Sequence, residues 1–140
     1  MPKLPVTSLT TAILALVFAI LCIRVVRGRL STKTSLGDGG AGSVATGNDA
    51  AASPLLVAVR AHGNFAEYVP LSLILLALVE AQGGARPMVL GLAAALVVAR
   101  VAHPFGLGRR SPNAPRAAGF TFNVGMLVVA ALYLIYLSFS

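Results

Sequence analysis

The sequence predicts an all-α integral membrane protein, a bundle of four spanning helices that forms a single domain over residues 1–140. Composition and length favour this fold class. Of the 140 residues, 57% are hydrophobic and only 11% are charged, with a mean hydropathy of +0.86, whereas soluble domains average about 45–50% apolar residues. A spanning helix needs about 20 residues, so the chain has room for about four of them and for no separate soluble domain.

The first apolar stretch covers residues 6–27 and is long enough to cross a bilayer. Positive charge is sparse before it, at Lys3, and dense at and after its end, at Arg24, Arg27, Arg29 and Lys33. Because cytoplasmic loops carry an excess of Lys and Arg, we expect the N-terminus outside the cell. The following segment, about residues 30–53, is rich in Gly, Ala and Ser and is expected to be a flexible cytoplasmic loop. It lacks the GK[ST] ending of a phosphate loop.

The second and third apolar stretches, residues 55–82 and 87–107, are expected to form an antiparallel pair. Gly83 and Gly84 can end one helix, and Pro87 can begin the next. The tight turn between them should face outside. The third stretch reaches spanning length only if its polar end is included.

The last stretch, residues 114–138, is the clearest span because it has no charge after Arg116. A basic loop precedes it and should return to the cytoplasm, with Asn113 as the expected helix cap and Pro115 in the first turn. Close packing of the third and fourth helices is predicted by their small residues, which are Gly91, Ala93, Ala94, Ala95, Gly119 and Gly125.

Charged side chains within the second stretch predict a functional site. Arg60, Asn64 and Glu67 follow i, i+4, i+7 spacing, which places them on one helical face, and His62 points elsewhere. A charge inside a span costs roughly 2.5–3.5 kcal/mol and tends to face the protein interior or a polar cavity. The alternative is that Arg60 and Glu67 only neutralise each other within the bundle, or that Arg60 reaches the headgroups. Pro70 predicts a kink beside Glu67.

A second polar face lies at the same end of the bundle. Arg100 and His103 are three residues apart on the third helix, and Arg116 is in the first turn of the fourth. A small anionic ligand with carboxylates, an amine and amides suits this end, and glutathione fits that description. The arginine in the first turn of the fourth helix, together with the positive end of that helix, would favour the thiolate of glutathione. A lipid headgroup is the alternative ligand.

The segment RAHGNFAEYVP closely resembles the signature of the MAPEG proteins, the membrane-associated proteins in eicosanoid and glutathione metabolism. Arg60, Asn64, Glu67 and Pro70 stand in the family's spacing. Further along, Arg100, His103 and Arg116 fall at the spacing of corresponding residues in microsomal glutathione transferases and prostaglandin E synthases. The chain is therefore similar to a bacterial member of the microsomal glutathione transferase type.

This resemblance implies a homotrimer in the bacterial inner membrane, with glutathione bound between subunits near the cytoplasmic face. The distribution of Lys and Arg places both termini outside. The resemblance implies Arg116 as the catalytic residue that stabilises the thiolate. The residues that it implies as glutathione ligands are Arg27, Arg60, Asn64, Glu67 and His103. Two positions depart from the family pattern, because Leu107 replaces a frequent Tyr and Phe120 lacks a hydroxyl.

The implied function is a glutathione transferase, with peroxidase as a second activity, that acts on hydrophobic electrophiles or lipid hydroperoxides in the membrane. The alternative within the family is a noncatalytic lipid-binding or scaffold protein. A small multidrug exporter also fits the length, but the first helix has no acidic residue to couple protons. A single cysteine, Cys22, excludes an internal disulfide and a CxxC metal site, and no metal or nucleic acid is expected.

Overall fold

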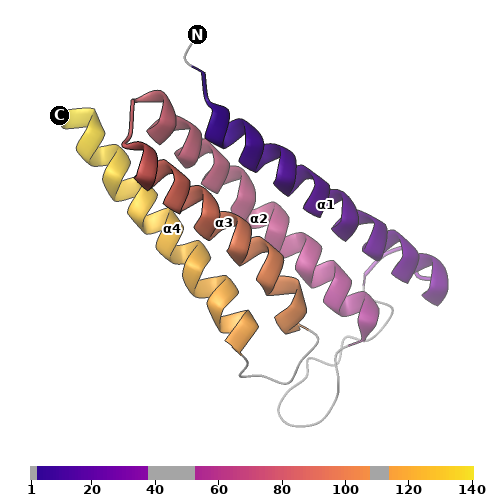
Figure 1. Cartoon of the computed structure of the whole chain (residues 1–140). Coiled ribbons are helices and arrows are strands. Elements are labelled where there is room, and N and C mark those ends of the chain that lie inside the picture. The colour runs from indigo at the N-terminus through magenta and orange to yellow at the C-terminus, as the bar shows by residue number, and fades with distance from the viewer. Residues whose placement is uncertain (1–2, 38–52, 108–113) are drawn as a thin grey trace.

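The computed structural model of the chain describes residues 3–37, 53–107 and 114–140, without the side chains of 105–107 and 114–116. These residues form four helices that lie side by side: α1 (Pro5–Thr32), α2 (Pro54–Ala81), α3 (Arg86–Leu107) and α4 (Ala114–Phe139) (Figure 1). All four are long and apolar enough to cross a membrane. The prediction of an all-α, four-helix membrane bundle is therefore confirmed.

The helices begin and end close to the expected positions, with one clear difference. Helix α1 continues past the apolar stretch 6–27 to Thr32, and Lys33 then ends it in the left-handed conformation with φ 53°. No proline interrupts this extension, so the helix can outlast the apolar pattern. The rest of the expected flexible loop, residues 38–52, and the expected cap Asn113 lie outside the described residues.

Helix α2 begins at a side-chain cap and ends at a Schellman turn. The hydroxyl of Ser53 accepts a hydrogen bond from the Leu56 N–H at 3.1 Å, as a serine N-cap does. At the other end, Gly83 has φ 76° and Gly84 N–H donates to the Val79 carbonyl at 2.9 Å. This is the pattern in which a left-handed glycine closes a helix, so the predicted tight turn is present.

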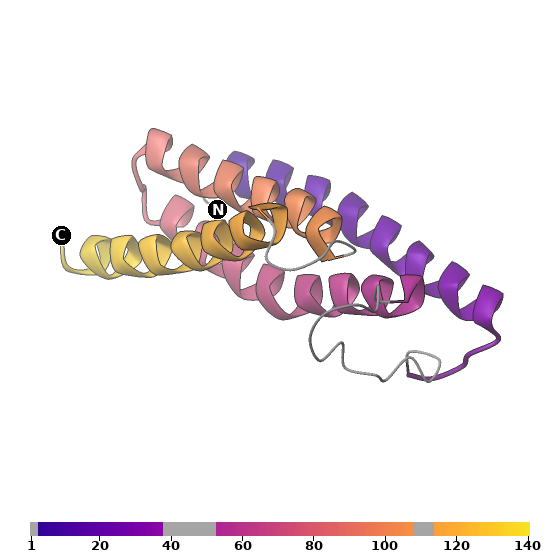
Figure 2. The same ribbon diagram turned by 90° about the horizontal axis from the view of Figure 1, so that it is seen from below.

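The helices pack in the order α1, α2, α3, α4, with α1 and α4 on opposite sides of the central pair (Figure 1 and Figure 2). The α3–α4 contact is the most extensive. The core between the helices is apolar and includes Leu14, Leu76, Val79, Leu96 and Ala130, all at 1% exposure or less. Most apolar side chains on the outer faces are exposed, as expected for helices surrounded by lipid or by other copies.

The start of α1 and the end of α4 lie at the end of the bundle where α2 turns into α3 (Figure 1). At this end Glu80 of α2 accepts hydrogen bonds from the backbone N–H groups of Val6 and Thr7, at 2.9 and 2.8 Å. Tyr133 of α4 accepts another from the Ala85 N–H at 2.9 Å. Polar side chains thus fasten the ends of α1 and α4 to this turn.

Candidate ligand site where α2 and α4 begin

The opposite end of the bundle holds the polar side chains that the sequence singled out. Arg100 of α3 is 2% exposed, and its Nη1 donates to Asn64 Oδ1 of α2 at 2.8 Å. Its Nη2 donates to the Gly119 carbonyl of α4 at 3.3 Å, and the guanidinium lies 5.7 Å from the centroid of the Tyr68 ring. The two predicted polar faces therefore meet, with Arg100 at the junction of three helices.

His103 is buried one turn after Arg100, at 8% exposure. Gly119 lets α4 approach it, because a Cβ placed on Gly119 would lie 2.9 Å from the His103 Cβ and 3.1 Å from its Cα. Such distances are below normal contact, so a side chain at Gly119 would push the helices apart. The close helix packing predicted from small residues is thus found at Gly119.

Arg60 and Glu67 share the outer face of α2 with Asn64, but both are exposed while Asn64 is half-buried. The cost of a charge in a membrane had led us to expect that both would face the interior of the bundle, but they do not. Nor do they neutralise each other inside it. Arg27 on α1 is also exposed. One subunit therefore presents these three charges on its surface.

His62 lies off this polar face, as predicted. Its ring stacks on Phe18 of α1, with centroids 4.8 Å apart and an angle of 23° between the planes. Phe18 also stacks on Phe65, at 5.3 Å. His62 is thus part of the α1–α2 contact.

The remaining predicted positions lie at the start of α4 and the end of α3. Arg116 belongs to the first turn of α4, but its side chain and that of Leu107 lie outside the described part of the chain. Phe120 is described and is 58% exposed. The structure therefore brings Asn64 and Arg100 together, with His103 one turn further along α3.

Two buried polar groups were not among the predicted ligand residues. Arg100 was noted for its spacing but not counted among the ligand residues, and its Nε has no hydrogen-bond partner among the described residues. Asn123 of α4 is 1% exposed, and its Oδ1 has none either. An amide in the middle of an otherwise apolar stretch was the sequence signal for Asn123.

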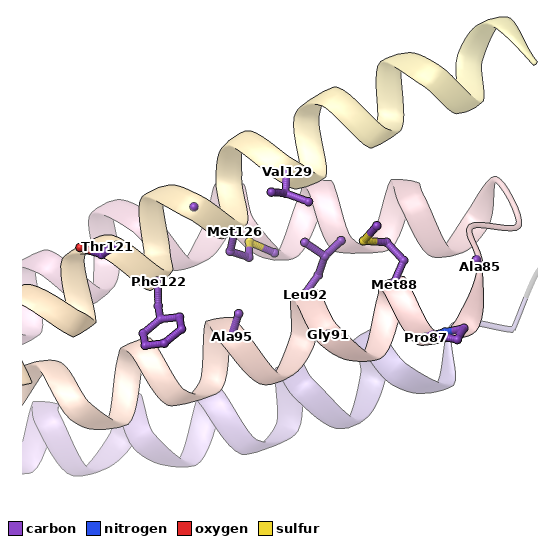
Figure 3. Close-up of a pocket in the computed structure, with 11 residues that line it drawn as sticks. Ala85, Pro87, Met88, Gly91, Leu92, Ala95, Thr121, Phe122, Met126 and Val129 are labelled. Carbon is purple, nitrogen blue, oxygen red and sulfur yellow. The ribbon is translucent and has the colours of Figure 1, made fainter.

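An apolar groove of about 780 Å³ lies between α3 and α4, away from the predicted ligand residues. Met88, Leu92, Met126 and Val129 point toward one another in it (Figure 3). None of the predicted glutathione ligands lines this groove. This groove and the polar cluster are thus separate features.

Fold and site together define a multi-pass α-helical membrane protein with a polar cluster buried near one end of the bundle. The sequence profile of the MAPEG family matches residues 7–136, and the chain belongs to this family. It is also 30% identical over 105 residues to the inner membrane protein YecN of Escherichia coli strain K12, and equally to YecN of strain O6:H1, which covers 75% of this chain and 72% of each relative. No solved structure matches it.

These comparisons agree with the four spanning helices. The chain is an integral, multi-pass protein of the inner membrane.

Proposed function

We propose that this protein is a glutathione-dependent transferase that conjugates glutathione to hydrophobic electrophiles in the membrane, with peroxidase as a second activity. Its family includes glutathione transferases. The observation that carries the proposal is the polar face of α2, where Asn64 is held by Arg100 between the exposed Arg60 and Glu67. This set combines hydrogen-bond donors, a cationic side chain and one carboxylate within two turns of α2.

These groups match the chemistry of glutathione. Arg60 and Arg27 would pair with its carboxylates, Glu67 with its amine, and Asn64 and His103 with its polar backbone. Bound glutathione supplies the thiol that becomes the nucleophile. Arg116, in the first turn of α4 where the helix dipole is positive, would lower the free energy of the thiolate beside it. No nucleophilic side chain of the protein is required.

The exposed positions of Arg27, Arg60 and Glu67 support a site completed by a second copy of the chain. We propose a homotrimer with glutathione between subunits. We also propose that the site faces the cytoplasm and the termini face outside, from the clustering of Arg and Lys at the end where α2 and α4 begin. The hydrophobic electrophile would approach from lipid.

The test is a glutathione titration of detergent-purified protein, followed by the ultraviolet absorbance of the thiolate at neutral pH. The chain contains no Trp, which removes one source of ultraviolet absorbance from the protein itself. A thiolate signal that saturates at a fixed ratio to protein would support the proposal. Binding without thiolate would contradict the transferase activity, and no binding would favour the lipid-binding scaffold.

Arg116→Ala should abolish the thiolate signal and the transferase activity while leaving assembly intact. Without the cation, a thiol with a pKa near 8.5 is ionised to only a few per cent at neutral pH. The matched control is Arg24→Ala, which removes an exposed arginine from α1 and should change neither. Normal turnover in Arg116→Ala would refute the catalytic assignment.

A further inference from the structure

Arg100 is a buried cation, and its two hydrogen-bond acceptors among the described residues are both neutral. One is the amide oxygen of Asn64 and the other is the carbonyl of Gly119. In the described part of the chain the carboxylates are those of Glu67, which is exposed, and Glu80, which is bonded to the start of α1. Removing a partner from a buried cation is strongly destabilising, so the contact with Asn64 holds both side chains in place.

The contact also decides which way the Asn64 amide points. An asparagine has one acceptor, the oxygen, and two donors on its nitrogen, whereas arginine has donors only. The atom of Asn64 that faces Arg100 Nη1 at 2.8 Å must therefore be the oxygen. A flipped amide would set its NH₂ group against the guanidinium, so this orientation is fixed.

We infer that Arg100 is a positioning residue, which fixes the Asn64 amide so that its NH₂ group donates to an acceptor oxygen of the ligand. Asn64 is half-buried, so this NH₂ group is the part of the side chain that is left to meet a ligand. The inference rests on the proposed function, and it assigns to Asn64 a carboxylate or peptide carbonyl of glutathione as its partner.

The same contact makes Asn64 a stronger donor. A hydrogen bond from a cation to the amide oxygen polarises the amide and strengthens the bonds that its N–H groups donate. Arg100 is kept over the Tyr68 ring and against Gly119 of α4, so its own position is set by three helices. Arg100 thus links the start of α4, where Arg116 lies, to the ligand-binding face of α2.

The test is a double-mutant cycle on glutathione affinity, measured by isothermal titration on the detergent-purified full chain. Asn64→Ala should weaken glutathione binding roughly tenfold, the usual loss for one charge-assisted hydrogen bond. Arg100→Met should weaken it by a similar factor in the wild-type protein, but by less than about twofold in the Asn64→Ala background. Equal losses in both backgrounds would show that Arg100 does not act through Asn64.

Two conservative variants keep the inference testable if Arg100→Met fails to fold. Asn64→Asp preserves an acceptor for Arg100 but removes both donors, and it should weaken binding at least as much as Asn64→Ala. Arg100→Lys keeps the charge and a donor for Asn64, and its affinity should lie between those of wild type and Asn64→Ala. Wild-type affinity in Asn64→Asp would overturn the inference.

A ligand-free readout separates this inference from the proposed function. In ¹⁵N-edited spectra of the protein without glutathione, the side-chain NH₂ signals lost in Asn64→Asp belong to Asn64. They should shift clearly in Arg100→Lys and stay unchanged in the control Arg24→Lys. Unshifted signals would refute the Arg100–Asn64 contact itself. If the signals shift in Arg100→Lys but the wild-type protein does not bind glutathione, the result would instead refute the proposed function. The ligand assigned to Asn64 would then be refuted with it.

Discussion

At the scale of single residues, the missing side chain of Gly119 sets the distance between α3 and α4. A Cβ there would meet the backbone of α3 as well as the His103 Cβ, with the Ala99 carbonyl at 3.3 Å. Backbone atoms cannot rotate away, so the helices themselves would have to separate. The Gly119 carbonyl would then move away from Arg100, which it accepts from at 3.3 Å.

Gly119→Ala should therefore lower the free energy of unfolding by about 1–3 kcal/mol, the usual cost of overpacking. The measurement is unfolding in a detergent mixture, followed by circular dichroism. Gly125→Ala is the matched control on the same helix, because nothing lies within 4 Å of a Cβ at Gly125. If both substitutions had the same effect, close packing at Gly119 would not be its cause.

The same glycines show how far residue-scale prediction reaches. Small residues on α3 and α4 were all expected to mark close packing, yet Gly91 and Gly125 line the apolar groove and have open space beside them. Composition does not say which residue faces the neighbouring helix. Spacing did place Asn64 and Arg100 at one end of the bundle, but not in contact, because the contact depends on how the helices are rotated about their axes.

At the scale of the helices, α1 lacks a cap of its own and receives one from α2. Its N-cap residue is Leu4, which has no side-chain hydrogen bond. The first N–H groups of a helix have no partner within it, and here the Glu80 carboxylate accepts from two of them. A carboxylate at a helix N-terminus is also favoured by the helix dipole. This contact was not expected, because Glu80 and Val6 are far apart in the sequence.

Glu80→Gln should loosen the start of α1, because only one of the two oxygens remains an acceptor. We expect a loss of roughly 1–3 kcal/mol, the cost of a buried donor left unpaired, and faster hydrogen exchange at Val6 and Thr7. Arg86→Gln, which removes an exposed charge at the same end, is the control. Unchanged exchange at both amides in Glu80→Gln would show that the carboxylate does not cap α1 in solution.

At the scale of the whole molecule, the single subunit leaves an acid uncovered in a place where lipid would not tolerate it. Glu67 is exposed and lies in the middle of α2. At about 1.5 Å per residue, this 28-residue helix is about 42 Å long. Since the hydrocarbon core is about 30 Å thick, Glu67 is inside it wherever α2 sits along the membrane normal. The four spans were predictable from hydropathy. Hydropathy does not predict whether lipid or another subunit covers their outer faces.

Covering this face with another copy of the chain removes Glu67 and Arg60 from lipid without any further change in the fold. A charge near the helix centre, as at Glu67, would otherwise cost roughly 2.5–3.5 kcal/mol on the insertion scale. Native mass spectrometry of the detergent-purified protein should therefore give a homotrimer, at three times the subunit mass of 14.3 kDa. The double variant Arg60→Leu, Glu67→Leu removes both charges from this face. It should therefore favour the monomer over the trimer in the same measurement. A monomeric wild type would refute the covered face, and a dimer would refute the trimer while leaving the face covered.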